Sequence, residues 1–101
     1  MIIVNATIKT SEATILATKE AIKIMEQASQ AEAGCEDYTF SVELNDPSVL
    51  RITECWQNKE ALAAHFKTPH MADFQAVMAQ NPPENLKVNF YDATAIDSPM
   101  G

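Results

Sequence analysis

The sequence predicts an α+β fold in which a four-stranded antiparallel sheet carries two helices on one face. Apolar and polar residues alternate in four segments, as they do in half-buried strands, and two further segments repeat apolar residues at helical spacing. These segments follow the order βαββαβ, which is the ferredoxin-like plan. The length of 101 residues fits one domain, residues 1–101, in which 97–101 are expected to form a disordered tail.

The first strand and the first helix follow directly from these two periodicities. Residues 2–9 alternate, with one apolar face made of Ile2, Val4, Ala6 and Ile8. Residues 12–32 are rich in Ala, Glu and Lys and carry apolar residues at helical spacing, namely Ile15, Ile22, Met25 and Ala28. Gly34 just beyond this segment is a typical helix stop.

The second and third strands are expected at Cys35–Leu44 and Val49–Gln57, joined by a turn at 45–48. A four-residue loop would pair Leu44 with Val49 and place Tyr38 on the face opposite Trp56. Either a bulge realigns the strands, or both faces of the sheet are covered. We favour the second alternative, with the helices on one face and a second copy of the chain on the other, which predicts a homodimer.

The second helix is expected to begin at the cap Asn58 and to break near Lys67. Thr68 and Pro69 form a fresh cap and first helical position, so the helix restarts there and ends at Asn81-Pro82-Pro83. Residues 86–96 alternate again and complete the sheet as a fourth strand.

Composition and charge exclude several classes of function. Seven basic and fourteen acidic residues give a net charge of −7, which opposes binding to nucleic acid and to anionic membranes. The first residues, MIIVNATIK, read as a strand and not as a signal peptide, and the chain has no apolar run of about 18 residues, so we expect a cytoplasmic protein. Two cysteines without a paired motif predict no metal site.

Several short motifs, taken in order, point to a family. They are Ala33-Gly34-Cys35 with Tyr38, Glu54-Cys55-Trp56, Ala61-Leu62 with His65, and Thr68-Pro69-His70 with Phe74. This series resembles the antibiotic biosynthesis monooxygenase (ABM) domain of the small quinol monooxygenase type, over nearly the whole chain. The resemblance implies a dimeric α/β barrel with one pocket per subunit, between the helices and the sheet. It also implies oxidation of a quinol, phenol or polyketide-like ring by molecular oxygen, with no metal, flavin or other cofactor.

Such chemistry needs a base that removes a phenolic proton, and histidine suits this task near neutral pH. The two histidines lie close together in the sequence, and His65 is the first candidate, with His70 second. Alternatively, His65 is a partly buried side chain bonded to backbone, and His70 is an exposed residue at a helix start.

Two further residues are predicted to take part in catalysis. Asn5 lies mid-strand against β propensity and matches the family's pocket asparagine, although an amide satisfied by backbone is the alternative. Trp56 is expected to form a pocket wall, or else to pack in the core.

The other predicted pocket residues, together with His70, are expected to bind substrate. Glu54 is either a pocket carboxylate or half of an ion pair, and we favour the structural role. The remaining candidates are apolar or aromatic side chains that line the cavity or, alternatively, fill the core: Tyr38, Phe40, Met71 and Phe74.

Other functions remain open for this fold. One is a cofactor-free isomerase of a small phosphosugar signal, since the pattern of His65 with Thr68-Pro69-His70 occurs in such relatives; another is a ligand-binding dimer without turnover. Haem-degrading relatives use a strand asparagine, a tryptophan and a proximal histidine. Asn5 matches the first, but the other two positions fall on His65 and Gln75, which argues against haem.

Overall fold

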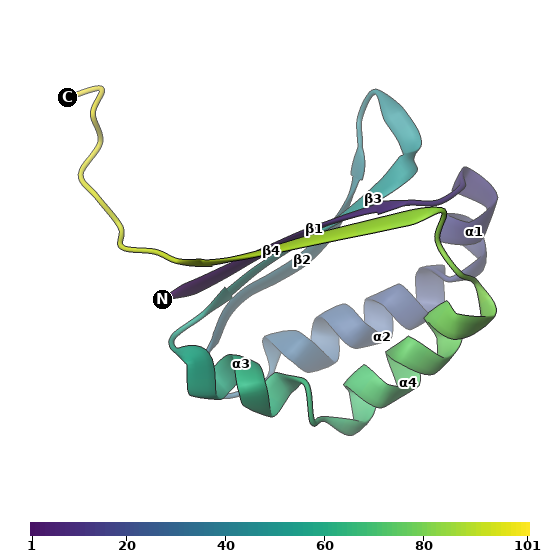
Figure 1. Ribbon diagram of the computed structural model, residues 1–101, viewed down its shortest axis with the longest axis horizontal. Helices are drawn as coiled ribbons and strands as arrows, with labels where there is room; N and C mark the ends of the chain where they lie inside the picture. The colour runs from purple at the N-terminus through teal and green to yellow at the C-terminus, as the bar shows by residue number, and fades with distance from the viewer.

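The computed structural model describes residues 1–101 as one antiparallel sheet with helices packed on one face (Figure 1). The elements are β1 (Ile2–Lys9), α1 (Glu12–Ala17), α2 (Lys19–Gln30), β2 (Cys35–Glu43), β3 (Asp46–Trp56), α3 (Lys59–His65), α4 (Pro69–Gln80) and β4 (Asn85–Asp92). The strand order is β2-β3-β1-β4, with every neighbouring pair antiparallel. This arrangement confirms the predicted ferredoxin-like α+β fold.

The inner strand β1 contributes one whole face of alternating residues to the hydrophobic core. Ile2, Val4, Ala6 and Ile8 are buried beneath the helices. They join one hydrophobic cluster with Met25 of α2, Tyr38 of β2, Leu50, Ile52 and Trp56 of β3, and Leu62 of α3. Burying these side chains is the main favourable contribution to folding.

The first helical segment is two helices, where one helix over 12–32 was expected. The interruption lies at Thr18, which is the C-cap of α1 and the N-cap of α2. Its hydroxyl donates to the carbonyl oxygen of Thr14 at 2.8 Å, a back-bond that bends helices. α2 then ends at Gln30, two residues before the predicted end.

The register of β2 on β3 corrects the favoured interpretation of the sequence. Phe40 pairs with Ile52 and Tyr38 pairs with Glu54, because the register shifts between Val42 and Glu43. A second shift follows Cys35. β-Bulges therefore realign the two strands, and Tyr38 and Phe40 lie on the helical side of the sheet.

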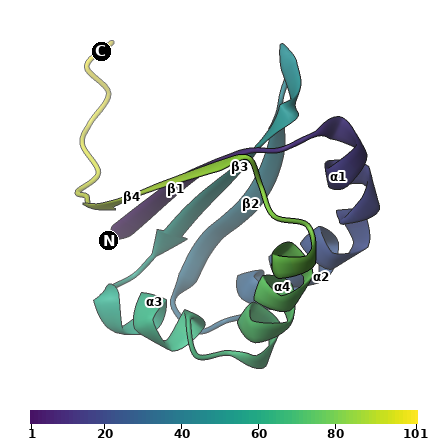
Figure 2. The same ribbon diagram turned by 45° about the vertical axis from the view of Figure 1, so that its right-hand side comes forward.

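The face of the sheet opposite the helices, which no helix covers in Figure 2, is consequently polar over most of its area, and not the second apolar face that we expected. Its positions alternate with the buried ones and carry Asn5 and Thr7 of β1, Thr39 and Ser41 of β2, Arg51 and Thr53 of β3, and Lys87 and Asn89 of β4. Arg51 donates to Glu43 and to Thr7 across this face. This face therefore gives no apolar reason to expect that a second copy of the chain covers it.

The break in the second helical segment is confirmed. α3 ends at His65, and the hydroxyl of Thr68 caps α4 by accepting from the backbone amide of Met71 at 3.3 Å. β4 ends at Asp92, short of the predicted 96, and the residues after it leave the sheet (Figure 1). β4 pairs only with β1, and it ends at Asp92 because that residue pairs with Ile2, the first residue of β1.

Replacing Gly34 with alanine should destabilise the fold. Gly34 has φ of +80°, and a Cβ there would lie 2.6 Å from the Cβ of Ala61. The strained backbone and this contact should lower the free energy of unfolding by about 1–3 kcal/mol, measured by urea denaturation. Gly101→Ala is the control, since Gly101 has no neighbour within 4 Å and lies at the chain end. An unchanged midpoint for Gly34→Ala would contradict the prediction.

Candidate functional site

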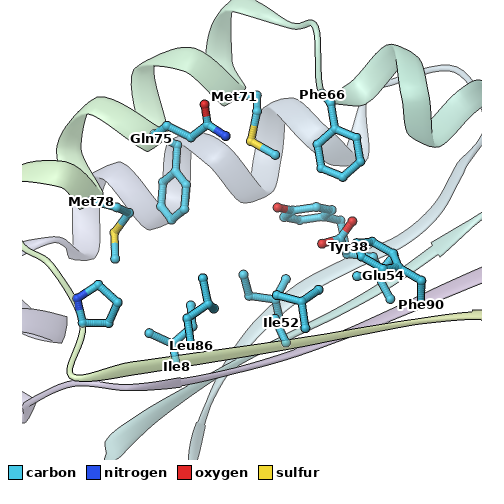
Figure 3. A pocket seen from close by; sticks show the side chains of 15 residues that line it. Ile8, Tyr38, Ile52, Glu54, Phe66, Met71, Gln75, Met78, Leu86 and Phe90 are labelled. Carbon is cyan, nitrogen blue, oxygen red and sulfur yellow. The ribbon is translucent and has the colours of Figure 1, made fainter.

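A cavity of about 410 Å³ lies between α4 and the helical face of the sheet (Figure 3). Twelve of its 15 lining residues are hydrophobic. They come from three elements above all: Val4, Ala6 and Ile8 of β1, Leu86, Val88 and Phe90 of β4, and Met71, Phe74 and Met78 of α4. The cavity is therefore an apolar space built from paired strands and one facing helix.

The cavity opens towards β4 because that edge strand is incompletely covered. Register pairs Ile8 with Leu86 and Val4 with Phe90, so both strands send side chains to the same side. The β1 residues are buried, whereas Leu86 and Phe90 are each 55% exposed. The break after α3 restarts the helix as α4, which forms the opposite wall and leaves this edge of the sheet accessible.

Glu54 of β3 is the acidic residue of the cavity. It is only 7% exposed, and its Oε1 accepts a hydrogen bond of 2.9 Å from the indole Nε1 of Trp56. Burial raises the pKa of the Glu54 carboxyl, while the Trp56 hydrogen bond and the nearby His65 oppose this rise. Figure 3 shows the carboxyl group beside Tyr38 at one end of the cavity. A carboxyl group in such surroundings can exchange protons with a bound ligand.

Tyr38 of β2 forms the adjoining aromatic wall. Its ring meets Trp56 edge to face, with centroids 6.3 Å apart, and lies 5.3 Å from the ring of His65. Burial, followed by the negative charge of Glu54, raises the pKa of the Tyr38 hydroxyl above its ordinary value. The hydroxyl therefore stays protonated and can donate a hydrogen bond at neutral pH.

The structure places both histidines in a separate cluster behind this wall. His65 is fully buried, and its Nδ1 lies 2.6 Å from Oε2 of Glu32. His70 Nε2 lies 2.8 Å from the same oxygen. The other nitrogen of His65, Nε2, is buried without a hydrogen-bond partner. The ring of His65 is 4.7 Å from that of Trp56.

Four predicted residues, Tyr38, Glu54, Met71 and Phe74, line the cavity. Asn5 does not, which corrects its expected placement: alternation along β1 turns Val4 and Ala6 inward, so Asn5 is exposed on the other face.

The other four predicted residues also lie outside the cavity lining. Trp56 and His65 are buried one layer behind it, so Trp56 positions Glu54 and does not itself form a wall. Phe40 lines a separate groove with Ile15 and Ile22, and His70 lies at a small hollow between α2 and α4. None of these four residues borders the cavity.

Sequence reasoning missed Glu32 and the β4 side of the cavity. Glu32 lies two residues beyond the end of α2, where the helix dipole disfavours a carboxylate. A carboxylate in such an unfavourable position indicates a specific side-chain partner, which here is the pair of histidines. Leu86 and Phe90 gave no such signal, because their alternation is equally typical of a core strand.

Comparison with known proteins identifies the family. The family model for antibiotic biosynthesis monooxygenase matches residues 1–77 of the chain. The chain belongs to the antibiotic biosynthesis monooxygenase family. No helix of this family member is long and apolar enough to cross a membrane.

Solved structures share this ABM fold. A putative antibiotic biosynthesis monooxygenase from Deinococcus radiodurans is 27% identical, with a TM-score of 0.89 over 100% of both chains. A conserved protein of unknown function from Bacteroides thetaiotaomicron is 31% identical, with a TM-score of 0.80 over 89% of this chain and 94% of that chain.

A curated relative matches more locally. The uncharacterized protein sll1783 from Synechocystis is 33% identical over 48 residues, which are 48% of this chain. The match spans about a third of that protein, 33% of its length.

Replacing Trp56 with phenylalanine should raise the pKa of Glu54 further. The substitution removes the indole N–H that stabilises the carboxylate, and leaves burial to act alone. Titration of the side-chain carboxyl carbons by NMR measures this shift. Asp46 is an internal control in the same spectra, because Ser48 and Lys9 lower its pKa far from the cavity. An unchanged or lowered pKa of Glu54 would contradict the prediction.

Proposed function

We propose that this ABM protein is a cofactor-independent monooxygenase that oxidises a small quinol, phenol or polyketide-like aromatic ring with molecular oxygen. The observation that carries the proposal is one buried carboxyl group, Glu54, in an otherwise apolar cavity. Apolar walls suit a flat ring, and the carboxyl group suits a ring hydroxyl.

The size and lining of the cavity support this class of substrate. A volume of about 410 Å³ falls within the usual range for small-molecule sites. Its polar groups are Glu54, Gln75 and the Tyr38 hydroxyl, and no lysine or arginine lines it. An uncharged ring therefore fits better than the phosphosugar of an isomerase. Gln75 takes the position where haem-degrading relatives carry their histidine ligand, so haem is not favoured either.

Glu54 takes the role of base in this proposal, in place of His65. The base must reach a proton on the bound ring, and Glu54 borders the cavity whereas His65 does not. Because its pKa is raised, the Glu54 carboxylate is a stronger proton acceptor than an ordinary carboxylate. Tyr38, which stays protonated, can donate a hydrogen bond to the resulting ring oxygen anion.

The reaction needs no external electron donor. Glu54 accepts the hydroxyl proton, and the resulting ring anion passes one electron to O₂. The ring radical and superoxide then combine through a new C–O bond, and the peroxide so formed takes the proton back from Glu54. Glu54 then removes the ring C–H proton as the O–O bond breaks, and the departing hydroxide combines with that proton as water. A quinol and O₂ thus give a hydroxyquinone and water, with the ring supplying all the electrons. The apolar lining of the cavity disfavours water beside these intermediates.

The proposal includes a homodimer. The edge strand β4 presents apolar side chains on both faces, including Tyr91 on the face away from the helices, which is 50% exposed. Ile96, in the segment after β4, is 83% exposed. Exposed apolar groups on an unpaired edge favour an interface with another chain.

Replacing Glu54 with glutamine should lower the rate of oxygen consumption with an active quinol by about 10²–10⁴-fold, since the base is lost while its shape is kept. An oxygen electrode with a panel of quinols and phenols measures this rate. Glu43→Gln is the matched control, because Glu43 pairs with Arg51 on the polar face of the sheet.

The pH profile of the wild-type protein gives a second measurement. Turnover should fall as pH drops through the raised pKa of Glu54, which then holds its proton and cannot accept another. Full turnover in Glu54→Gln would show that Glu54 is not the base. No turnover by the wild type with any ring tested would contradict the proposed activity.

Sedimentation velocity at micromolar concentration should show a dimer. Tyr91→Glu should weaken it by at least about tenfold, because a charge would be buried in the interface. Leu16→Glu is the control, since Leu16 is an exposed apolar residue of α1 on the helical side. A wild-type monomer under these conditions would refute the dimer.

A further inference from the structure

We propose that Glu32, His65 and His70 form a binding site for a divalent transition-metal ion of the zinc type. The site is separate from the cavity, because none of the three residues lines it. The inference therefore does not depend on the proposed oxygenase activity.

The three side chains converge from three helix ends. Glu32 follows the end of α2, His65 is the last residue of α3, and His70 is the second residue of α4. Each offers one ligand atom, and these atoms all lie within 4.8 Å of one another. Zinc–ligand distances of about 2.0–2.2 Å in a tetrahedral site place ligand atoms roughly 3.3 Å apart. Side-chain movements of about 1 Å would therefore admit an ion between them.

The short contacts within this cluster require protons or a cation between its groups. One oxygen, Oε2 of Glu32, faces a nitrogen of each histidine at 2.6 and 2.8 Å. Three lone pairs at such distances repel unless protons or a cation lie between them. A metal ion replaces the two bridging protons and neutralises the carboxylate in one step.

The buried Nε2 of His65 is a second observation that points to metal. It has no hydrogen-bond partner, so a proton bridging Nδ1 to Glu32 leaves a bare lone pair in the core. When a metal ion takes Nδ1, the ring proton moves to Nε2. The ring that carries it packs against the rings of Trp56 and Tyr38, whose centroids lie 4.7 and 5.3 Å from that of His65. An N–H group interacts favourably with an aromatic face, whereas a lone pair does not.

The donor set selects the class of ion. Two imidazoles and one carboxylate suit zinc and neighbouring first-row metals, while Mg²⁺ and Ca²⁺ prefer oxygen ligands. Entry is possible because the side chains of Glu32 and His70 are 13% and 20% exposed, whereas that of His65 is at 0%. A bound ion would hold the ends of α2, α3 and α4 together and so stabilise the break that shapes the cavity.

The test is titration of the chelator-treated full-length protein with Zn²⁺ by calorimetry and with Co²⁺ by visible absorption. We expect one ion per chain, Co²⁺ d–d bands typical of nitrogen and oxygen ligation, and a melting temperature that rises with Zn²⁺ concentration. Glu32→Gln and His70→Ala should each weaken binding at least tenfold. Glu60→Gln is the matched control, because Glu60 is an exposed acid in the first turn of α3.

His70→Ala keeps the test valid if the buried positions tolerate no change, since His70 is partly exposed at the helix start, and circular dichroism checks that each variant folds. Long-range ¹⁵N NMR of the histidine rings should show the His65 proton on Nε2 in the zinc-bound chain. Absence of saturable binding, or equal binding by the wild type, Glu32→Gln and His70→Ala, would overturn the proposal. The cluster would then be a hydrogen-bonded network alone.

Discussion

The pairing of β2 with β3 is the constraint on which the site depends. A strand has a side-chain period of two, so a shift of one residue would move Tyr38 and Phe40 to the opposite face. The irregularity after Val42 places Tyr38 directly across from Glu54 and Phe40 across from Ile52. One bulge thus supplies the aromatic wall of the cavity and leaves the other face polar. The same register brings Tyr38, Trp56 and His65 into mutual contact.

The sequence was sufficient for the fold because its elements are marked by local chemistry. Alternation identified the strands, and Thr68-Pro69 identified the break between α3 and α4, since a cap and a fixed proline φ act within one turn. The register of β2 was not predictable in the same way. Turn preferences favour residues 45–48, which are Asn, Asp, Pro and Ser, whereas the structure turns at Leu44-Asn45. The decision comes from burying Tyr38 in the core, which is a tertiary effect.

The site was less predictable for a related reason. Residue type favoured His65 as base, because histidine titrates near neutral pH. Position favours the proposed base instead: His65 ends α3 and is fully buried, whereas Glu54 lies on a strand face that borders the cavity. Asn5 illustrates the same limit, since one step along β1 separates a cavity position from an exposed one. Glu32 is distant in sequence from both histidines, and only the fold brings them together.

Trp56 connects the two polar centres of the molecule. Its indole N–H binds the carboxyl group of Glu54, and its ring packs on His65, whose Nδ1 meets Glu32. A charge at the Glu32 cluster therefore acts on Glu54 across the fully buried Trp56 ring, in surroundings of low dielectric. The nearby His65 already lowers the pKa of Glu54, while Glu32 raises it, in opposition to one another. A cation bound at the cluster would neutralise Glu32 and so shift the Glu54 pKa downward, which couples occupancy of the cluster to the basicity of the cavity carboxylate.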